Sequence, residues 1–328
     1  MQSSRPLRWG LRIATDLRFG AGHVARCAAL ARALPGLVEI FVDPASPTPG
    51  SLADFRCTAE ASIEGSDRLL AAARGELAAI FDSPAVRATA IEAAAESAWT
   101  AAFRDGPPYG PEHVSIDCSP SAQGGARLLG GPTWMPLDPG LAAARKGARR
   151  AKRNMAAACR VLVAFGARDS ADRTGTAAEV LMRLRADATI VLGRAYLGRD
   201  QIETLCARSP ALRIVSDPAD MLALYLSHDL AIGAPGVSQY ERACCALPAI
   251  LVAQNEQQVP LAAAWVARGC AVSAPATIDG LADAVQCLLD DGARRAALGA
   301  AAFDIVDGRG GERLAAALAE RAMPALAR

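Results

Sequence analysis

The stretch DLAIGAPGVSQYERACCALPAILV, residues 229–252, decides the fold. It opens with a short apolar run at 230–232, turns through GAPGVS, continues at helical spacing, and ends in a second apolar run at 249–252. Runs of this length with almost no polar interruption are typical of strands that are covered on both faces. A strand, a turn, a helix and another strand make one unit of a parallel sheet. The stretch therefore predicts an α/β domain.

The same alternation continues outward through the chain and occurs twice. Segments such as 24–34, in which apolar residues recur every three or four positions, separate the short apolar runs and predict helices. We expect strands at 11–15, 38–42, 78–81, 98–104 and 113–116, and again at 160–165, 189–192, 212–215, 230–232, 249–252 and 271–273. This pattern predicts two Rossmann-like, doubly wound domains that face each other across a cleft, with the ligand at the carboxyl ends of the strands.

The length of the chain sets the domain organisation. Its 328 residues suffice for two domains, each with its own core. The basic run RKGARRAKRN, residues 145–154, lies between the two halves, and we interpret it as a connector or a solvated helix face rather than a phosphate or lipid patch. We expect an N-terminal sugar and catalytic domain at 1–145, a nucleotide-binding domain at 155–310, and a closing helix at 311–328 that packs back on the first domain.

Composition excludes several classes of partner. The formal net charge is +1 and charged residues make up 21%, so no general attraction to nucleic acid or to a membrane surface is expected. The N-terminus lacks an apolar signal, and no run reaches the roughly 18 to 20 apolar residues that span a bilayer. The nine cysteines show no paired C-x-x-C spacing and are interpreted as small core residues, Cys159, Cys206, Cys270 and Cys287 among them. We expect a reduced, cytoplasmic protein.

The turn inside the opening stretch is a candidate phosphate site. Gly233 and Gly236 lead into a helix at Val237, whose first N–H groups and positive dipole end favour an anion. The hydroxyl of Ser238 is placed to donate to a phosphate, and Glu241, one turn further, to accept from the two hydroxyls of a ribose. The alternatives are an ordinary helix N-cap for Ser238 and a first-turn acid that complements the dipole for Glu241.

A second motif, RFGAGHVARC at residues 18–27, follows the first expected strand. Gly20 and Gly22 leave the backbone open to a close approach, and His23 is the first side chain beyond them. A histidine has a pKa near neutrality and is the commonest general base. The alternative is a capping or packed histidine at the start of a helix.

Together these motifs carry a resemblance to a known family. GAGHVARCAALA at 20–31, LVAFGARD at 162–169 and the opening stretch, followed by a polar QQ pair, resemble the UDP-sugar hydrolases of the pseudaminic acid pathway. Those enzymes are related to GT-B glycosyltransferases, including the one that adds N-acetylglucosamine to lipid I. The similarity covers most of the chain, with the three motifs in the same order and at matching spacing.

The resemblance implies a GT-B-like fold with the nucleotide on the C-terminal domain. It implies that His23 takes a proton from a water that attacks C1 of a UDP-sugar, which releases a free acetamido-deoxy sugar with inversion. The partner is then a UDP-sugar of nonulosonate or flagellar glycan synthesis, and neither a cofactor nor a resident metal is required. The loop at Arg168 is a further candidate contact for the pyrophosphate or the sugar, with a plain turn as its alternative.

Three departures from the family pattern leave the reaction open. The Asp-x-Tyr of the hydrolases is matched only by Asp82, which we expect to contact the substrate, because no tyrosine follows. An expected arginine is replaced by Asp138. The Asn-Gln pair of the hydrolases is Gln257 and Gln258 here, as in the lipid I transferase, where the pair contacts the donor sugar. An inverting glycosyltransferase with a UDP-sugar donor is therefore the second hypothesis, and a silent nucleotide-sugar-binding scaffold is the third.

Overall fold

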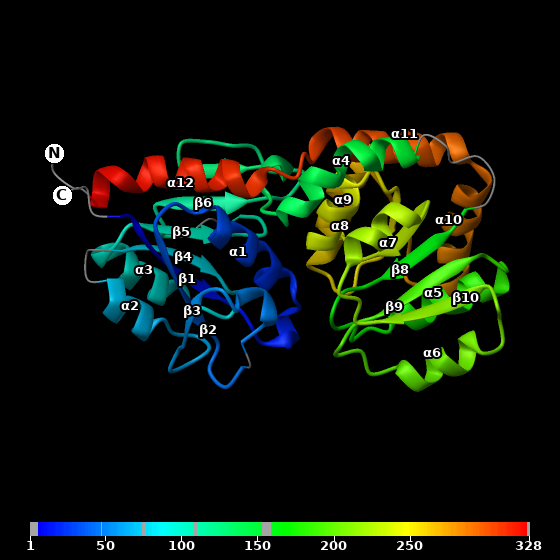
Figure 1. The fold of residues 1–328 in the computed structure, drawn as a ribbon, viewed down its shortest axis with the longest axis horizontal. Coiled ribbons are helices and arrows are strands. Elements are labelled where there is room, and N and C mark those ends of the chain that lie inside the picture. The colour runs from blue at the N-terminus through cyan, green and yellow to red at the C-terminus, as the bar shows by residue number, and fades with distance from the viewer. Residues whose placement is uncertain (1–5, 47, 74–76, 108–109, 153–158, 327–328) are drawn as a thin grey trace. The chain divides into compact units, whose positions relative to one another are not determined.

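The computed structural model describes residues 6–46, 48–73, 77–107, 110–152 and 159–326 (Figure 1). The chain divides into two compact units. Unit 1 is the chain up to Asp138 together with the segment from Arg309, and unit 2 runs from Pro139 to Gly308. The domain limit expected at residue 145 falls inside helix α4 (Pro139–Lys152), and the limit expected at residue 155 lies outside the described residues.

Unit 1 is built on a parallel sheet with the strand order β3-β2-β1-β4-β5-β6-β7. Its strands are β1 (Arg8–Ile13), β2 (Leu37–Val42), β3 (Arg56–Ala59), β4 (Ala78–Asp82), β5 (Thr100–Phe103), β6 (Val114–Asp117) and β7 (Leu128–Gly130). Helices α1 (Gly22–Ala33), α2 (Asp67–Ala73), α3 (Ala88–Ser97) and α12 (Gly310–Leu326) complete the unit. The chain winds outward from β1 to β3 and then in the other direction from β4, so the switch point lies between β1 and β4.

Unit 2 repeats this plan with a parallel sheet of order β10-β9-β8-β11-β12-β13. Its strands are β8 (Val161–Ala164), β9 (Ala188–Leu192), β10 (Leu212–Ser216), β11 (Leu230–Gly233), β12 (Ala249–Leu251) and β13 (Val272–Ser273). Its helices are α4, α5 (Arg173–Arg183), α6 (Arg199–Cys206), α7 (Met221–Ser227), α8 (Val237–Cys244), α9 (Gln258–Ala267), α10 (Ile278–Asp290) and α11 (Gly292–Ile305). The switch point lies between β8 and β11.

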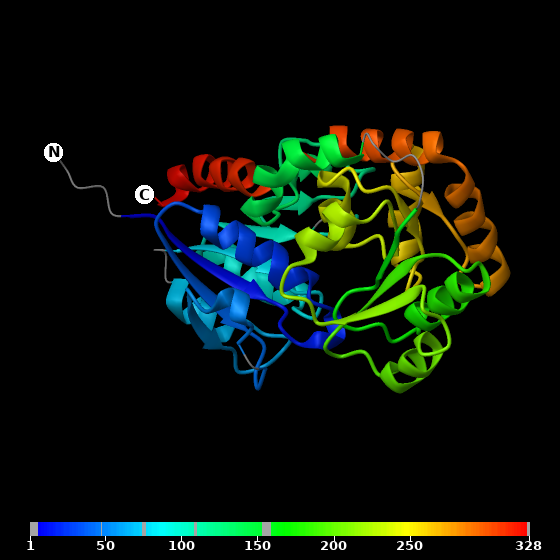
Figure 2. The ribbon, with the colours of Figure 1, turned by 45° about the vertical axis from the view of Figure 1, so that its right-hand side comes forward.

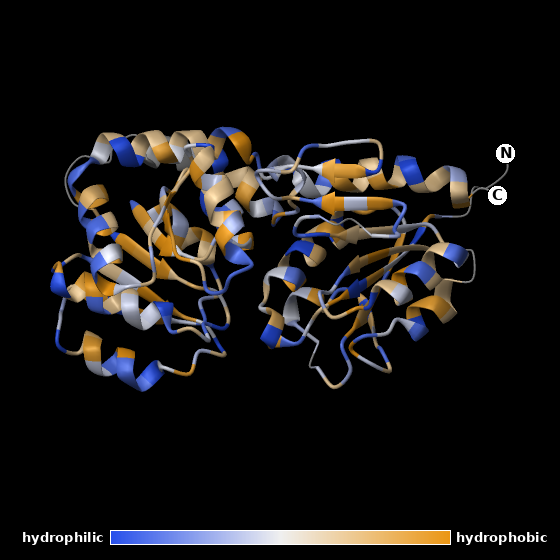
Figure 3. Cartoon of the chain, turned by 180° about the vertical axis from the view of Figure 1, so that it is seen from behind, coloured by the Kyte–Doolittle hydropathy of each residue, from blue (hydrophilic) through white to orange (hydrophobic). Residues whose placement is uncertain are grey.

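Helices cover both faces of each sheet, which explains the apolar strands. In unit 2, α5 packs against α6 and α10, whereas α8 packs against α4 and α11 (Figure 2). In unit 1, α1 packs against α12 and α2 against α3. The strands are the most hydrophobic segments, and polar residues gather on the helices and loops (Figure 3). Strands β4, β5, β6, β8, β9, β11 and β12 are buried along their whole length.

The α/β class and the expected strands are confirmed, but two strands were missed. β3 is an edge strand of only four partly exposed residues, and β7 has three residues that end in glycine, so neither carries a long apolar signal. The closing helix α12 belongs to unit 1, on which it was expected to pack. None of the described helices is long and apolar enough to cross a membrane.

Two smaller expectations were met only in part. Of the two alternatives for the basic run, the helix holds and the connector does not, since residues up to Lys152 belong to α4. There the Arg145 guanidinium donates to the carbonyl oxygen of Phe303 at 2.6 Å and stacks on its ring. Arg153 and Asn154 lie outside the described residues. Of the cysteines expected in the core, Cys287 is exposed on α10, and Cys159 and Cys206 are half-buried.

Candidate functional site

The switch point of unit 1 brings His23 and Asp82 together. His23 lies in the first turn of α1, which follows β1, and Asp82 is the last residue of the neighbouring strand β4. The ring nitrogen Nδ1 of His23 lies 2.7 Å from Oδ1 of Asp82. Because a carboxylate accepts, Nδ1 carries the proton and donates it, which leaves Nε2 as the basic nitrogen of the neutral ring. The side chain of His23 keeps 15% of its surface exposed, so part of it reaches solvent.

Asp82 is buried and its carboxylate is shared. Arg26 forms a two-pronged ion pair with it, from Nε to Oδ2 at 2.6 Å and from Nη2 to Oδ1 at 2.5 Å, and the thiol of Cys27 donates to Oδ2 at 3.1 Å. Burial alone would raise the pKa of Asp82, yet Arg26 and then His23 hold it far below its ordinary value. Both oxygens of Asp82 are therefore engaged within unit 1, and one of them orients the ring of His23. The contact with substrate expected at Asp82 stays a prediction.

The loop that carries Gly20 and Gly22 is held by a second buried ion pair. Asp43, just after β2, accepts from the backbone N–H groups of Thr15 and Asp16 at 2.7 and 2.9 Å. The same carboxylate lies 2.9 Å from the guanidinium of Arg12, and both side chains are fully buried. Gly20 has a φ of +80° with open space around it, so the chain turns there at little cost. The loop is thus fixed on one side and open on the other, directly before His23.

In unit 2 the expected phosphate turn connects β11 to α8. A Cβ at Gly233 would lie 2.3 Å from the carbonyl oxygen of Ala164 and 2.6 Å from Nη1 of Arg242, so only glycine fits there. Around Gly236, which is the N-cap, a Cβ would meet nothing within 4 Å, and no side chain caps α8. The fully buried Arg242 donates to the carbonyl oxygen of Ala234 at 2.6 Å and holds the turn. The turn is therefore rigid beneath and open at the start of the helix.

The structure decides against both structural alternatives for the helix residues. Ser238 is the second residue of α8 rather than its N-cap, and Glu241 lies beyond the first turn. One oxygen of Glu241 accepts from the hydroxyl of the buried Tyr225, on α7, at 2.7 Å. Burial, and then Glu241, raise the pKa of Tyr225 well above its ordinary value, so the phenol stays a donor. Glu241 is thus held in one orientation.

The loop after β8 carries one exposed and one buried charged residue. Arg168 is exposed, and its side chain forms no hydrogen bond or ion pair within the described residues. Asp169 is buried and accepts from the backbone N–H and the hydroxyl of Thr174 at 2.6 and 2.8 Å, so it secures the start of α5. Arg168 remains a candidate contact, whereas Asp169 has a structural function.

The two glutamines of the pair after β12 lie in different surroundings. Gln257 is exposed, while Oε1 of Gln258 accepts from the backbone N–H of Gln254 at 3.0 Å. Gln254 in turn donates to the carbonyl oxygen of Phe165, the residue after β8, at 2.9 Å. The loops after β8, β11 and β12 therefore meet at one edge of the sheet, beside the switch point.

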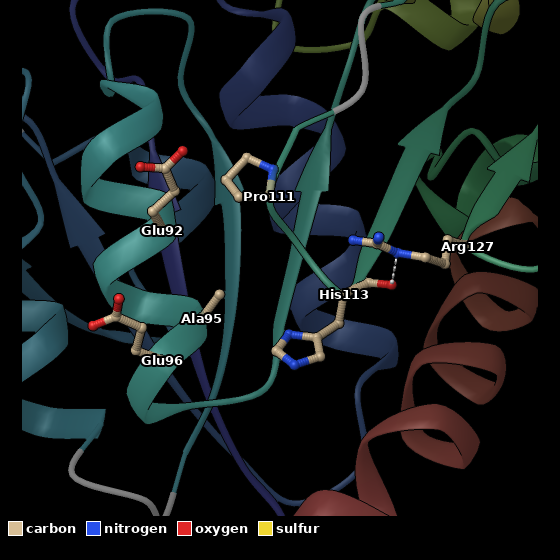
Figure 4. A pocket seen from close by; sticks show the side chains of 6 residues that line it. All are labelled: Glu92, Ala95, Glu96, Pro111, His113 and Arg127. Atoms are coloured by element: carbon tan, nitrogen blue, oxygen red, sulfur yellow. Dashed lines mark hydrogen bonds between the residues drawn. The ribbon is translucent and has the colours of Figure 1, made fainter.

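The remaining two histidines lie away from these carboxyl edges. His113 precedes β6 and, with Arg127 before β7 and Glu92 and Glu96 on α3, lines a pocket at the amino ends of these strands (Figure 4). That pocket is thus at the opposite edge of the sheet from His23. His228 is the C-cap of α7, and its Nδ1 lies 2.7 Å from the carbonyl oxygen of Leu224.

Several residues of these sites were missed from sequence. Arg26 and Cys27 stand three and four positions after His23, a spacing that places all three on one helix face. The Arg12–Asp43 pair has a weaker signal, a charged residue within an apolar strand. Tyr225 and Gln254 reach their partners only through the fold, so no local pattern marks them.

Comparison with known proteins gives a clear fold and limited sequence relatives. No protein-family model matches the chain. The spore coat polysaccharide biosynthesis protein SpsG of Bacillus subtilis is 28% identical over 155 residues, which are 46% of this chain and 44% of that protein. The uncharacterized protein MJ1062 of Methanocaldococcus jannaschii is 30% identical over 103 residues, 30% of this chain and 21% of that protein. The chain therefore spans less than half the length of either relative.

Solved structures match over almost the whole chain. MurG of Acinetobacter baumannii matches with a TM-score of 0.70 at 15% identity, covering 96% of this chain and 100% of that one. HepE of Anabaena in complex with UDP matches with 0.67 at 13% identity, covering 97% and 100%. The glycosyltransferase VinC in complex with dTDP matches with 0.65 at 14% identity, covering 98% and 100%. The expected GT-B-like fold is confirmed.

Proposed function

We propose that this chain is a UDP-sugar hydrolase in which His23 is the general base. The observation that carries the proposal is the contact between His23 Nδ1 and Asp82, because it fixes the tautomer whose Nε2 can take a proton. The enzyme class draws further support from HepE, whose structure contains UDP, and from SpsG, whose name assigns it to polysaccharide biosynthesis. The preference for water as the nucleophile rests on the resemblance to the hydrolases.

The proposal assigns nucleotide binding to unit 2. The start of α8 receives the diphosphate, where Ser238 adds a hydroxyl donor, and Glu241 accepts from the ribose hydroxyls. Gly233 and Arg242 already hold the turn rigid, so little conformational freedom is lost when the nucleotide binds. Arg168, Gln257 and Gln258 are further contacts to the diphosphate or the sugar in this proposal.

The reaction balances with these residues alone. The oxygen of water forms a bond to C1 of the sugar while the bond from C1 to the β-phosphate oxygen breaks, and the electron pair of that bond leaves with UDP. The proton of the water goes to Nε2 of His23, and Asp82, which is already paired with Arg26, holds the ring in the orientation that accepts it. The product is a free acetamido-deoxy sugar of the inverted anomeric configuration, as in nonulosonate synthesis.

An inverting glycosyltransferase is the second candidate. Glutamine at both positions of the 257–258 pair favours it, as does the fold of MurG and VinC. In that case His23 takes its proton from an acceptor hydroxyl instead of water. A scaffold that binds the nucleotide sugar without turnover is the third.

The test incubates the protein with UDP-amino-sugars in ¹⁸O-water and follows UDP by mass spectrometry and the first-formed anomer by NMR. Release of unlabelled UDP without an acceptor supports attack of water at C1, since attack at phosphorus would label the phosphate. Release only after an acceptor is added supports the transferase, and binding without turnover supports the scaffold.

A pair of histidine variants tests the role of the base. His23→Ala is expected to lower turnover by at least about 10²-fold and to leave the affinity for UDP unchanged. His113→Ala is the matched control, because it removes a histidine from the opposite edge of the same sheet, and it retains activity. Full activity of His23→Ala would refute the proposal.

A further inference from the structure

We propose that Arg26 is a positioning residue that keeps His23 in its neutral, proton-accepting form by neutralising Asp82. The functional meaning of this inference rests on the proposed role of His23, but the protonation state of the ring is a property of the free protein. Arg26 does not act on substrate here; it acts through Asp82.

The guanidinium of Arg26 and the ring of His23 both contact the carboxylate of Asp82. Both prongs of the Arg26 guanidinium contact Asp82, and Oδ1, which accepts from Arg26 Nη2, also accepts from Nδ1 of His23. The side chains of Arg26 and Asp82 are 7% and 2% exposed, so water screens their charges little. Burial alone would lower the pKa of Arg26, but Asp82 raises it well above its ordinary value, so the guanidinium stays charged.

Distance decides how these charges act on the ring. A lone carboxylate at 2.7 Å would favour imidazolium and occupy Nε2 with a proton before the reaction begins. Arg26 Nη2 lies 3.3 Å from His23 Nδ1, so a protonated ring would meet a positive charge at nearly the same distance. Attraction and repulsion fall with distance in the same way, so they largely cancel. The ion pair can therefore orient the ring without trapping it as imidazolium.

The other titratable groups around the pair do not change this balance. Burial raises the pKa of Cys27 and of Cys118, so both thiols stay neutral. The carboxylate of Asp105 lies 3.6 Å from Arg26 Nη1, on the far prong of the guanidinium, and is 79% exposed to screening water. Asp117, buried at the end of β6, accepts from the backbone N–H of Ser119.

The experiment titrates the histidine rings by NMR in protein labelled on histidine, without any ligand. The chain contains three histidines, so His113→Gln and His23→Gln variants assign the signals, and His113 and His228 serve as internal controls. Arg26→Met is expected to raise the titration midpoint of His23 by about 1 pH unit or more, because the carboxylate loses its counter-charge. Arg26→Lys, which keeps the charge, is the matched control and shifts the midpoint less.

The opposite charge change supplies the second arm. Asp82→Asn leaves Arg26 alone beside the ring and is expected to lower the midpoint by about 1 unit or more, and the double variant returns it toward the wild-type value. An unchanged or lower midpoint in Arg26→Met overturns the inference. If that variant fails to fold, an unchanged or higher midpoint in Asp82→Asn overturns it.

Activity provides a readout that separates this inference from the proposed function. The acid limb of the turnover profile of Arg26→Met is expected to move upward with the NMR midpoint, which a merely structural residue would not cause. If His23→Ala keeps full turnover, the proposed function fails while the titration result stands. If the midpoints do not move but His23→Ala is inactive, only the inference about Arg26 fails.

Discussion

Replacing Asp82 with asparagine tests how much the buried ion pair contributes to folding. The two side chains have nearly the same volume, so the change removes a charge without opening a cavity. It leaves the guanidinium of Arg26, which is 7% exposed, without its counter-charge. Loss of one partner of a buried pair costs about 3 to 5 kcal/mol of unfolding free energy, and we expect the lower end because asparagine still accepts a hydrogen bond.

An exposed pair with the same shortest distance is the control. Arg213 Nη2 lies 2.5 Å from Asp187 Oδ1, as close as the pair of Arg26 and Asp82, but these side chains are 56% and 42% exposed. Asp187→Asn is expected to cost at most about 1 kcal/mol. The contrast compares a buried carboxylate with several partners to an exposed carboxylate with one partner at the same shortest distance.

The assay is urea unfolding at pH 7, followed by circular dichroism. A chain with two compact units can unfold in two steps, so hydrogen exchange of β4 and β9 reports each unit separately. If Asp82→Asn costs no more than Asp187→Asn, burial does not set the strength of this pair and the reasoning is refuted.

The pH dependence gives a second check with a definite sign. The pKa of Asp82 lies far below its ordinary value in the folded protein, so the folded state binds this proton more weakly than the unfolded chain does. The stabilisation is therefore complete above the unfolded value of about 4 and is lost as the pH falls from there toward the folded pKa. The stability difference between wild type and Asp82→Asn is expected to shrink below about pH 4.

Two further changes probe unit 2. Gly233→Ala places a methyl group 2.3 Å from the carbonyl oxygen of Ala164 and is expected to cost about 1 to 3 kcal/mol by overpacking, whereas Gly236→Ala, with open space around it, leaves thermal stability nearly unchanged. Equal melting temperatures for the two variants would contradict this. Tyr225→Phe removes the hydroxyl that orients Glu241 and is expected to weaken UDP binding about tenfold in calorimetry, with an unchanged far-UV spectrum. Unaltered affinity would remove Glu241 from the proposed site.

Sequence by itself determined the layers and the two turns. Short, nearly continuous apolar runs between helical segments indicate parallel sheets that are covered on both faces, and every expected strand lies in one of the two parallel sheets. Glycines at 20, 22, 233 and 236 marked the points where strands turn into helices. Gly20 has a positive φ, and at Gly233 a Cβ would lie too close to the carbonyl oxygen of Ala164. The edge strands β3 and β7 were not predicted because they are short and bury too few residues to form a recognisable apolar run.

Only the tertiary structure decided what the side chains at those turns do. Asp82 lies 59 positions after His23 and meets it because the switch point of the sheet sets β1 beside β4. Arg26 is close to His23 in the helix, but its charge matters through the carboxylate that another strand supplies. Tyr225 and Gln254 likewise gain their roles from partners on other elements. Periodicity reports which face of an element is buried, whereas the pairing of polar groups depends on strand order, which no local stretch encodes.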